Sequence, residues 1–235
     1  MAMQEATYQD LAARWKRLRS RGLRVREVAC VGAPRTLLCA EYGDHALPAV
    51  LIAAGVHGDE PAGPHALLEL LETDALDPRF SYRLWPCTNP SGFDARTRES
   101  IDAVDINRTF GRGGGSPEAR AIVTANRDYK FELAIDLHED DGASGFYCYE
   151  YGGAGIGASV VDAVAARGVP IDARGHLTPD PIAEAQEIGG FSLVLLLARN
   201  AARRALTFET ASRRPFEERV ATHVAAVKLA LLRLP

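Results

Sequence analysis

Hydrophobic positions along the chain follow two different spacings, and these predict alternating strands and helices. Unbroken apolar runs, such as residues 49–55, are typical of strands that are buried on both faces of a sheet. Spacings of three and four, such as that of Val220, Val224 and Val227, are typical of helices with one apolar face. The predicted strands are 25–31, 36–41, 49–55, 82–87, 133–137, 146–151 and 205–208, and the predicted helices are 5–20, 61–72, 117–128, 156–167 and 216–232.

The order of these elements predicts a single α/β domain over residues 1–235. Strands that alternate with helices favour a three-layer fold, in which a central mixed, mostly parallel sheet has helices on both faces. A hairpin predicted at 25–41 makes the sheet mixed. Residues 89–115 are rich in Gly, Arg and Asp and show little periodicity, so they predict a long loop. Ordered loops of this length are usually functional.

Composition and charge narrow the classes of partner. The chain has 31 Asp and Glu against 27 Lys and Arg, a formal net charge of -4, so no global positive field favours nucleic acid or an anionic membrane. No apolar run reaches the roughly 18 residues of a membrane span, and polar groups interrupt residues 1–25 where a signal peptide would be apolar. The four cysteines are scattered without CxxC pairs. We therefore expect a cytoplasmic protein with a small-molecule substrate and no nucleic-acid or membrane partner, and the oligomeric state stays open.

Polar residues follow three of the predicted buried strands, at the sheet edge where ligands bind in α/β folds. His57 and Glu60 come after one strand, His138 after a second and Glu209 after a third. Two histidines and one glutamate with an open fourth position are the usual ligands of a catalytic zinc ion. The sequence therefore predicts one Zn²⁺ per chain at His57, Glu60 and His138. Glu209 is the candidate carboxylate for taking a proton from zinc-bound water.

The predicted loop at 89–115 contributes cations and an amide. Arg98 and Arg108 each offer a planar fork of donors that suits a carboxylate or the oxyanion of a tetrahedral intermediate. Asn107 stands beside Arg108. We expect one arginine to hold the substrate and the other to stabilise developing charge. Arg96, two residues before Arg98, competes for the same role.

The chain resembles the zinc carboxypeptidase (M14) family in six short segments that occur in the family's order. They are HGDE at 57–60, NPSGF at 89–93, TR at 97–98, DINRTF at 105–110, DLHE at 136–139 and TFET at 207–210. Short chains of this kind look most like the compact bacterial murein peptide amidase branch. The related succinylglutamate desuccinylase/aspartoacylase branch usually carries a further carboxy-terminal domain.

The resemblance implies a function and a role for each candidate residue. The implied function is zinc-dependent hydrolysis of an amide bond next to a free carboxylate, in a small peptide. Alternatives are an N-acyl amino acid deacylase and a non-catalytic zinc-binding or ligand-binding module. The implied roles are zinc ligation for His57, Glu60 and His138, general base for Glu209, carbonyl polarisation for Arg98, carboxylate binding for Asn107 and Arg108, and orientation of the first histidine for Asp105.

Two features depart from the family pattern. Digestive members carry a mobile tyrosine over the bound carboxylate, and no residue here is matched to it. The candidates are Tyr147, Tyr149 and Tyr151. In addition, Glu139 and two aspartates follow His138, where many relatives have serine. These acids predict either a negative rim that favours a substrate with a free amine or a solvated loop.

Overall fold

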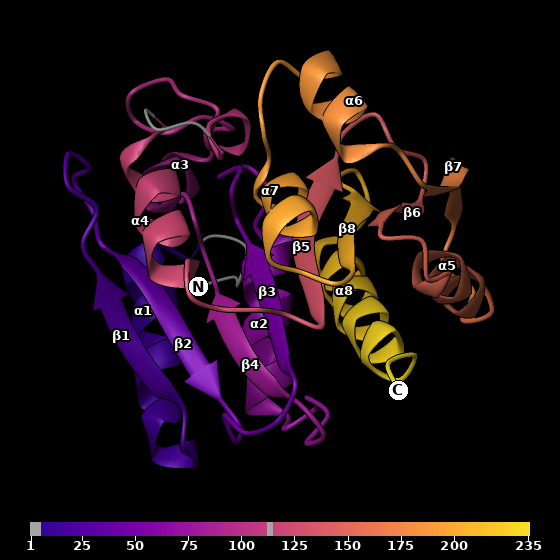
Figure 1. Cartoon of the computed structure of the whole chain (residues 1–235), viewed down its shortest axis with the longest axis horizontal. Helices are drawn as coiled ribbons and strands as arrows, with labels where there is room; N and C mark the ends of the chain where they lie inside the picture. The colour runs from indigo at the N-terminus through magenta and orange to yellow at the C-terminus, as the bar shows by residue number, and fades with distance from the viewer. Residues whose placement is uncertain (1–5, 112–114) are drawn as a thin grey trace.

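The computed structural model describes residues 6–111 and 115–235, and its strands form one mixed sheet (Figure 1). The order across the sheet is β1-β2-β4-β3-β5-β8-β6-β7. The strands are β1 (Arg24–Val28), β2 (Leu37–Tyr42), β3 (Ala49–Ala54), β4 (Ser81–Trp85), β5 (Leu133–Asp140), β6 (Phe146–Tyr151), β7 (Ile171–Leu177) and β8 (Ala205–Ala211).

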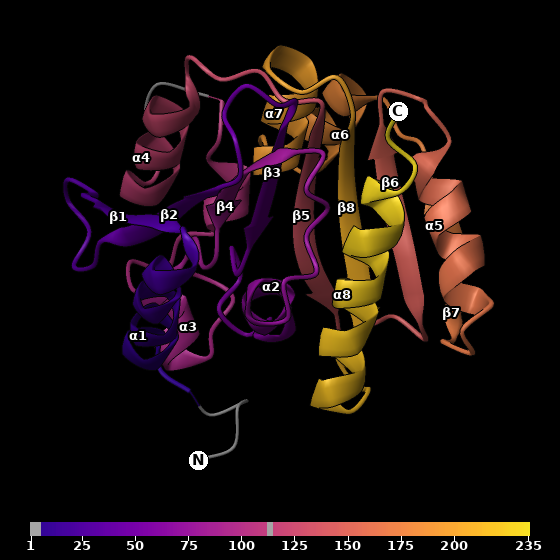
Figure 2. The same cartoon turned by 90° about the horizontal axis from the view of Figure 1, so that it is seen from below.

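Helices cover both faces of this sheet, as the sequence predicted. Figure 2 shows α1, α2, α5 and α8 on one face and α4, α6 and α7 on the other. The helices are α1 (Tyr8–Arg17), α2 (Ala62–Glu72), α3 (Pro90–Ala95), α4 (Pro117–Asn126), α5 (Ile156–Ala165), α6 (Pro181–Glu187), α7 (Leu193–Asn200) and α8 (Phe216–Leu231), with short 3-10 helices at Leu18–Arg21 and Ile106–Arg108. The predicted α/β fold with three layers is therefore confirmed.

The four central strands of the sheet are parallel, and the strand on each side of them runs in the opposite direction. Strands β4, β3, β5 and β8 run parallel to one another. Strand β2 is antiparallel to both β1 and β4, which confirms the predicted hairpin, and β6 is antiparallel to β8. The carboxyl ends of β3, β5 and β8 therefore meet at one edge, where polar side chains from distant parts of the sequence come together.

Alternation along the central strands supplies a separate core to each face. In β5, Ile135 and Leu137 pack in the cluster beneath α2 and α8, while Ala134 packs in the cluster beneath α7. In β3, Ile52 packs in the cluster beneath α2 and α8, and Leu51 packs in the cluster beneath α7. Because side chains at positions i and i+2 of a strand share a face, Asp136 and His138 lie on the α7 side with Ala134.

Several boundaries differ from the predictions. The segment 89–115 is not a featureless loop: α3 begins after Asn89, whose side chain accepts a hydrogen bond from the Gly92 amide, and a 3-10 helix follows at Ile106–Arg108. Residues 112–114 of that segment lie outside the described residues. Strands β5 and β8 extend further than expected, so His138 and Glu209 lie within strands. Strand β7 and helices α6 and α7 were not predicted.

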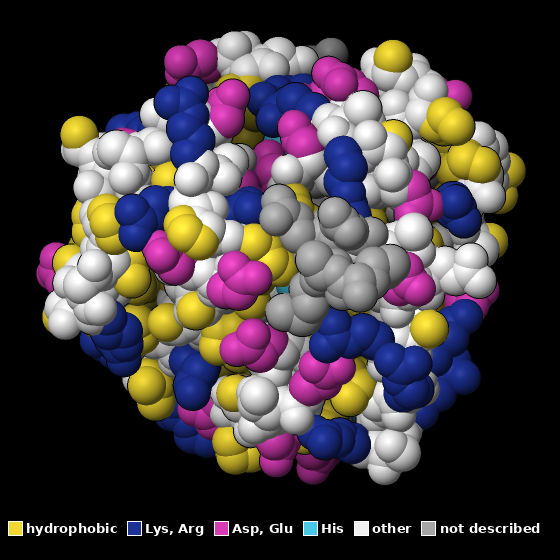
Figure 3. All heavy atoms as spheres, turned by 180° about the vertical axis from the view of Figure 1, so that it is seen from behind, with side chains coloured by type: hydrophobic (Ala, Val, Ile, Leu, Met, Phe, Trp, Pro, Cys, Tyr) yellow, Lys and Arg dark blue, Asp and Glu magenta, His cyan; other side chains and the backbone are white. Residues whose placement is uncertain are grey.

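The surface carries no sign of a strong single-charge field on the face that Figure 3 draws. Lysine and arginine side chains are interspersed with aspartate and glutamate there, in keeping with the net charge of -4. Within residues 6–111 and 115–235, no helix combines the length and apolar character that crossing a membrane requires.

Candidate metal centre and substrate cleft

The three predicted metal ligands converge at the carboxyl ends of the central strands. His57 and Glu60 lie in the turn between β3 and α2, and His138 lies near the end of β5. One ligand atom from each residue lies within 4.8 Å of the other two, and all three side chains are buried. Residues that are 78 positions apart in the sequence thus form one compact donor set.

Glu60 lies between the two histidines. Its Oε1 is 2.6 Å from Nδ1 of His57, and its Oε2 is 3.0 Å from Nδ1 of His138. Burial alone would raise the pKa of Glu60, but the two imidazoles hold it well below its usual range. The carboxylate is therefore ionised. Its two oxygens and both Nδ1 atoms are directed toward one common position.

The opposite nitrogen of each histidine faces a second carboxylate. Nε2 of His57 lies 3.3 Å from Oδ1 of Asp105, and Nε2 of His138 lies 3.3 Å from Oδ2 of Asp136. Metal-ligating histidines usually direct their other nitrogen to a carboxylate in this way, which fixes the ring and makes it a better ligand. The donor set and both supporting carboxylates therefore fit a zinc ion with an open fourth position.

Asp136 was missed in the sequence analysis. It is 1% exposed, and neither carboxylate oxygen has a hydrogen-bond partner among the described residues, so His138 is its evident electrostatic partner. The signal was available, because Asp136 precedes His138 by two positions in a strand and must share its face. Asp105, which was predicted, also accepts a hydrogen bond from the backbone amide of Asn107 at 2.9 Å.

A glycine contact holds the turn that carries the first two ligands. A Cβ atom on Gly58 would lie 1.9 Å from the carbonyl carbon of Gly92, so only glycine fits between this turn and α3. The Gly58 amide also donates to the carbonyl of Thr97 at 2.9 Å. The metal-ligand turn is thereby fastened to the segment that supplies Arg98.

Glu139 has a structural position that contradicts the expectation of a solvated acidic loop. It is 5% exposed, accepts a hydrogen bond from the Ala62 amide at 2.6 Å, and pairs with Arg219 of α8. Its own backbone amide donates to Oε2 of Glu60 at 3.0 Å. Burial raises the pKa of Glu139 to about 7, against the opposing effect of Arg219. Glu139 therefore fastens β5 to α2 and α8 behind the metal ligands.

The prediction of an unusually negative rim is also weakened by pairing. The carboxylate of Asp140 accepts hydrogen bonds from the hydroxyl of Tyr147 at 2.8 Å and from Arg174 at 2.7 Å. Asp141 is exposed. Of the three acids that follow His138, two thus form ion pairs with arginine side chains of the protein.

The structure distinguishes Arg98 from Arg96. Nη1 of Arg98 lies 3.3 Å from Nδ1 of His57, and its Nη2 donates to Asp105 at 3.0 Å. Arg96 instead lies over the ring of Phe93, with 4.7 Å between its guanidinium carbon and the ring centroid. Only Arg98 of the two borders the metal ligands.

Glu209 faces the metal ligands from the neighbouring strand. It is the register partner of His138 in the ladder between β5 and β8, and it is partly exposed to the cleft. Burial raises the pKa of its carboxyl, His138 lowers it, and Glu60 raises it. Arg214, five positions later in the sequence, pairs with Glu218 at 2.6 Å instead of with Glu209.

These groups surround a cleft of about 230 Å³, which we call the metal cleft. On β6, alternation directs three tyrosines into it, and two of them bind acids: Tyr147 donates to Asp140, and Tyr151 donates to Glu184 at 2.8 Å. Seven of the eight predicted site residues line it, and Asp105 lies behind His57. The seven are His57, Glu60, Arg98, Asn107, Arg108, His138 and Glu209.

Asn107 and Arg108 form the end of the metal cleft where α7 begins. The side-chain oxygen of Asn107 accepts a hydrogen bond from the Leu193 amide at 3.3 Å, and Arg108 donates to the Asn107 carbonyl at 3.2 Å. The Arg108 side chain remains about one-third exposed, at 33%. Its guanidinium is therefore available to an anion in the cleft.

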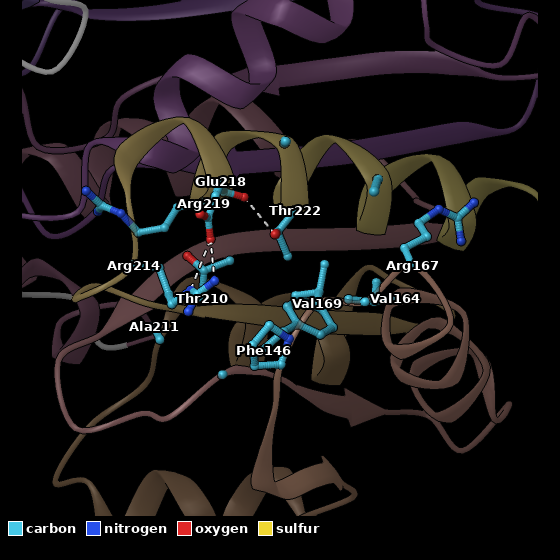
Figure 4. A pocket seen from close by; sticks show the side chains of 15 residues that line it. Phe146, Val164, Arg167, Val169, Thr210, Ala211, Arg214, Glu218, Arg219 and Thr222 are labelled. Carbon is cyan, nitrogen blue, oxygen red and sulfur yellow. Dashed lines mark hydrogen bonds and ion pairs between the residues drawn. The ribbon is translucent and has the colours of Figure 1, made fainter.

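A second cavity of about 300 Å³ lies between α5 and α8, and we call it the helix cavity (Figure 4). Apolar groups such as Phe146, Val164 and Val169 line most of it. Arg214 and Arg167 lie toward its two ends in the view of Figure 4. None of the metal ligands borders this cavity.

The fold and the buried His-Glu-His site together define a zinc carboxypeptidase-like metallohydrolase. Solved structures show the same fold. A protein described as a metallopeptidase from Shewanella amazonensis SB2B matches with a TM-score of 0.79 and 23% identity, over 94% of this chain and 91% of that one. A metallo-carboxypeptidase from Pseudomonas aeruginosa, in complex with (2-guanidinoethylmercapto)succinic acid, matches with a TM-score of 0.75 and 15% identity, over 97% and 68% of the two chains.

Residues 46–234 match the model of the succinylglutamate desuccinylase/aspartoacylase catalytic domain. The chain belongs to this family. Carboxypeptidase SOL1 from Arabidopsis thaliana is 33% identical over 111 residues, a match that covers 39% of this chain and only 23% of that protein. Of the two branches that the sequence resembles, the family model therefore matches the desuccinylase/aspartoacylase branch.

Proposed function

We propose that the protein hydrolyses an amide bond next to a free carboxylate, in an N-acylated amino acid or at the carboxy terminus of a short peptide. The observation that carries this proposal is the arrangement of the metal cleft. His57, Glu60 and His138 would hold one zinc ion, with Glu209 beside them and Arg108 in the same cleft. A zinc ion bound there would lower the pKa of a water molecule to about 7 and polarise the substrate carbonyl.

Glu209 is suited to moving the protons of this reaction. A general base must lie within reach of the attacking water and then return the proton to the leaving nitrogen. Glu209 meets the first condition, since it is the register partner of His138 and lines the same cleft. A pKa raised by burial lets the carboxyl hold the proton between the two transfers.

Each of the two arginines would bind a different negative charge of the reacting substrate. Arg98 borders His57 and Asp105, close to where the oxyanion of a tetrahedral intermediate would form. Arg108, together with Asn107, offers a fork of donors that suits the substrate carboxylate. Nη2 of Arg98 and Nη1 of Arg108 lie 3.0 and 3.9 Å from the same oxygen of Asp105, so the oxyanion and the carboxylate would bind at neighbouring positions in the cleft.

The comparisons favour N-acylated amino acids over peptides. The desuccinylase/aspartoacylase model covers residues 46–234, whereas the match to the plant carboxypeptidase covers 39% of the chain. Both substrate types would present the same leaving amino acid with a free carboxylate. We also infer that the protein acts in the cytoplasm on small molecules.

The test combines metal analysis with two substrate panels. The purified protein is expected to hold about one zinc ion per chain, to lose activity with a chelator and to regain it with zinc. One panel contains succinylated and acetylated amino acids, and the other contains short peptides. Glu209→Gln should lower kcat by at least about a thousandfold while zinc stays bound. The matched control is Glu217→Gln, at an exposed position on α8.

Two results would contradict the proposal. Unchanged turnover by Glu209→Gln would remove the assigned base. A zinc-loaded protein that hydrolyses neither panel, yet binds a carboxylate, would support a non-catalytic binding module.

A further inference from the structure

The metal cleft contains a carboxylate that the proposed reaction does not use. Glu184, on α6, lines the cleft and is partly exposed to it. Its Oε2 accepts a hydrogen bond from the hydroxyl of Tyr151 at 2.8 Å. Because Tyr151 is only 3% exposed, this contact holds Glu184 against a fixed wall of the cleft.

Glu184 differs in its partners from three other acids of the cleft, whereas Glu209 and Asp141 share with it the lack of an ion pair among the described residues. Glu60 faces two histidines, Glu139 pairs with Arg219, and Asp140 pairs with Arg174. In the part of the chain that the structure describes, Glu184 has no Lys, Arg or His nitrogen within 4.0 Å. Its remaining oxygen is therefore open to a cation or a donor that enters the cleft.

The position of Glu184 relative to Arg108 follows from how α6 and α7 pack. The segment between these helices lies directly on the chain at 107–110: the Phe110 amide donates to the Phe191 carbonyl at 3.0 Å. A Cβ atom on Gly190 would lie 2.1 Å from the Arg108 carbonyl oxygen. Burial raises the pKa of Glu184, and the nearby guanidinium of Arg108 opposes this. Arg108 and Glu184 thus face the same end of the cleft with opposite charges.

We propose that Glu184 selects substrates whose leaving amino acid has a cationic side chain, such as lysine, ornithine or arginine. This inference rests on the proposed function, in which Arg108 binds the carboxylate of that amino acid. With the carboxylate on Arg108, the side chain would extend toward α6 and α7, where Ile188 at the end of α6 and Val194 of α7 line the wall. A long aliphatic stem packs on such groups and places its charged end at a carboxylate.

The proposed substrate preference of this chain differs from the substrate that its family's name describes. Succinylglutamate carries a carboxylate on the side chain of the leaving amino acid, and Glu184 would repel it. A lysine side chain of similar reach would be attracted instead. Charge at one position of the cleft therefore determines which amino acid leaves.

The test compares side chains that differ in charge and little in length. Nα-acetyl-lysine, Nα-acetyl-norleucine and Nα-acetyl-glutamate are assayed with the zinc-loaded protein. We expect kcat/KM for the lysine substrate to exceed that for norleucine by about tenfold or more, and that for glutamate to be lowest. Glu184→Gln should reduce the lysine-to-norleucine ratio to near one. Glu187→Gln, one turn further along α6 and exposed, should keep the wild-type ratio.

A binding measurement keeps this inference separate from the proposed reaction. Zinc-loaded Glu209→Gln is titrated calorimetrically with Nα-acetyl-lysine and Nα-acetyl-norleucine, so discrimination is measured without turnover. Equal affinity for the two ligands, or a ratio that Glu184→Gln leaves unchanged, would overturn the role of Glu184. Absence of hydrolysis alongside selective binding of the lysine ligand would overturn only the proposed reaction.

Discussion

The metal cleft and the helix cavity are of similar size but differ in chemistry. The helix cavity, at about 300 Å³, is the larger of the two, and apolar side chains form most of its wall. The metal cleft, at about 230 Å³, brings together two histidines, two arginines and several carboxylates from five separate segments. Convergent polar groups with perturbed pKa values indicate a reactive site, whereas cavity volume alone does not.

The two cavities share one wall. Arg219 lines the helix cavity, while its guanidinium pairs with Glu139, whose backbone amide binds Glu60 in the metal cleft. A buried ion pair of this kind contributes little net stability, but removing one partner leaves an uncompensated charge in the protein interior. The pair therefore connects the packing of α8 to the position of a metal ligand.

The largest expected effect comes from removing one partner of the ion pair between Arg219 and Glu139. Arg219→Met should lower the free energy of unfolding by about 3–5 kcal/mol, because Glu139 is left buried and uncompensated. Urea denaturation of the metal-free protein measures the loss. Adding Glu139→Gln should restore part of it by removing the stranded charge. A single variant as stable as the wild type would show that the pair does not connect the two cavities.

Buried histidines in the protein also differ in their surroundings. His57 and His138 are buried beside carboxylates, which raise their pKa values against the effect of burial. His65 is equally buried between Phe93 and Phe216, with no hydrogen-bond partner for its ring nitrogens in the described structure. Burial, together with two nearby arginines, lowers the pKa of His65 to about 4. The same residue type thus prefers opposite charge states in the two settings.

His65 should make the protein sensitive to acid. Its pKa is about 6.5 in the unfolded chain and about 4 in the folded one, so between these values only the unfolded state takes up the proton. Stability is therefore lost as pH falls from about 6.5 to 4, by up to about 3 kcal/mol. Urea curves of the wild type and His65→Leu, measured at several pH values with a chelator present, isolate this contribution. Parallel pH dependence in the two proteins would contradict the assignment.

Asp136 supplies a smaller effect that is confined to the metal cleft. Asp136→Asn should weaken zinc binding by about 10–100-fold, because His138 loses the carboxylate that orients its ring. Competition with a chromophoric chelator measures the affinity. Asp128→Asn, at an exposed position, is the control. Wild-type affinity in Asp136→Asn would show that the buried carboxylate has no part in metal binding.

The sequence predicted the part of the metal cleft at the strand ends better than the part that α6 and α7 form, for a physical reason. His57, His138 and Glu209 each follow or end an apolar strand, and parallel strands must bring their carboxyl ends together. Glu184 and the helices around it lie in 171–200, where short elements depend on contacts with 107–110 that no local spacing reveals. Glu139 was misjudged because its burial depends on Arg219, 80 positions later.

The smallest expected effect concerns the helix cavity alone. Ala225→Leu adds apolar volume to its wall and should raise the free energy of unfolding by roughly 0.5–1 kcal/mol, with kcat/KM within about twofold of the wild type. Ala165→Leu, at an exposed helical position outside the cavity, controls for helix propensity. Thermal unfolding and the acyl amino acid assay measure the two properties. A large loss of activity without loss of stability would show that the helix cavity takes part in function. The distinction between a reactive metal cleft and a merely structural helix cavity would then be wrong.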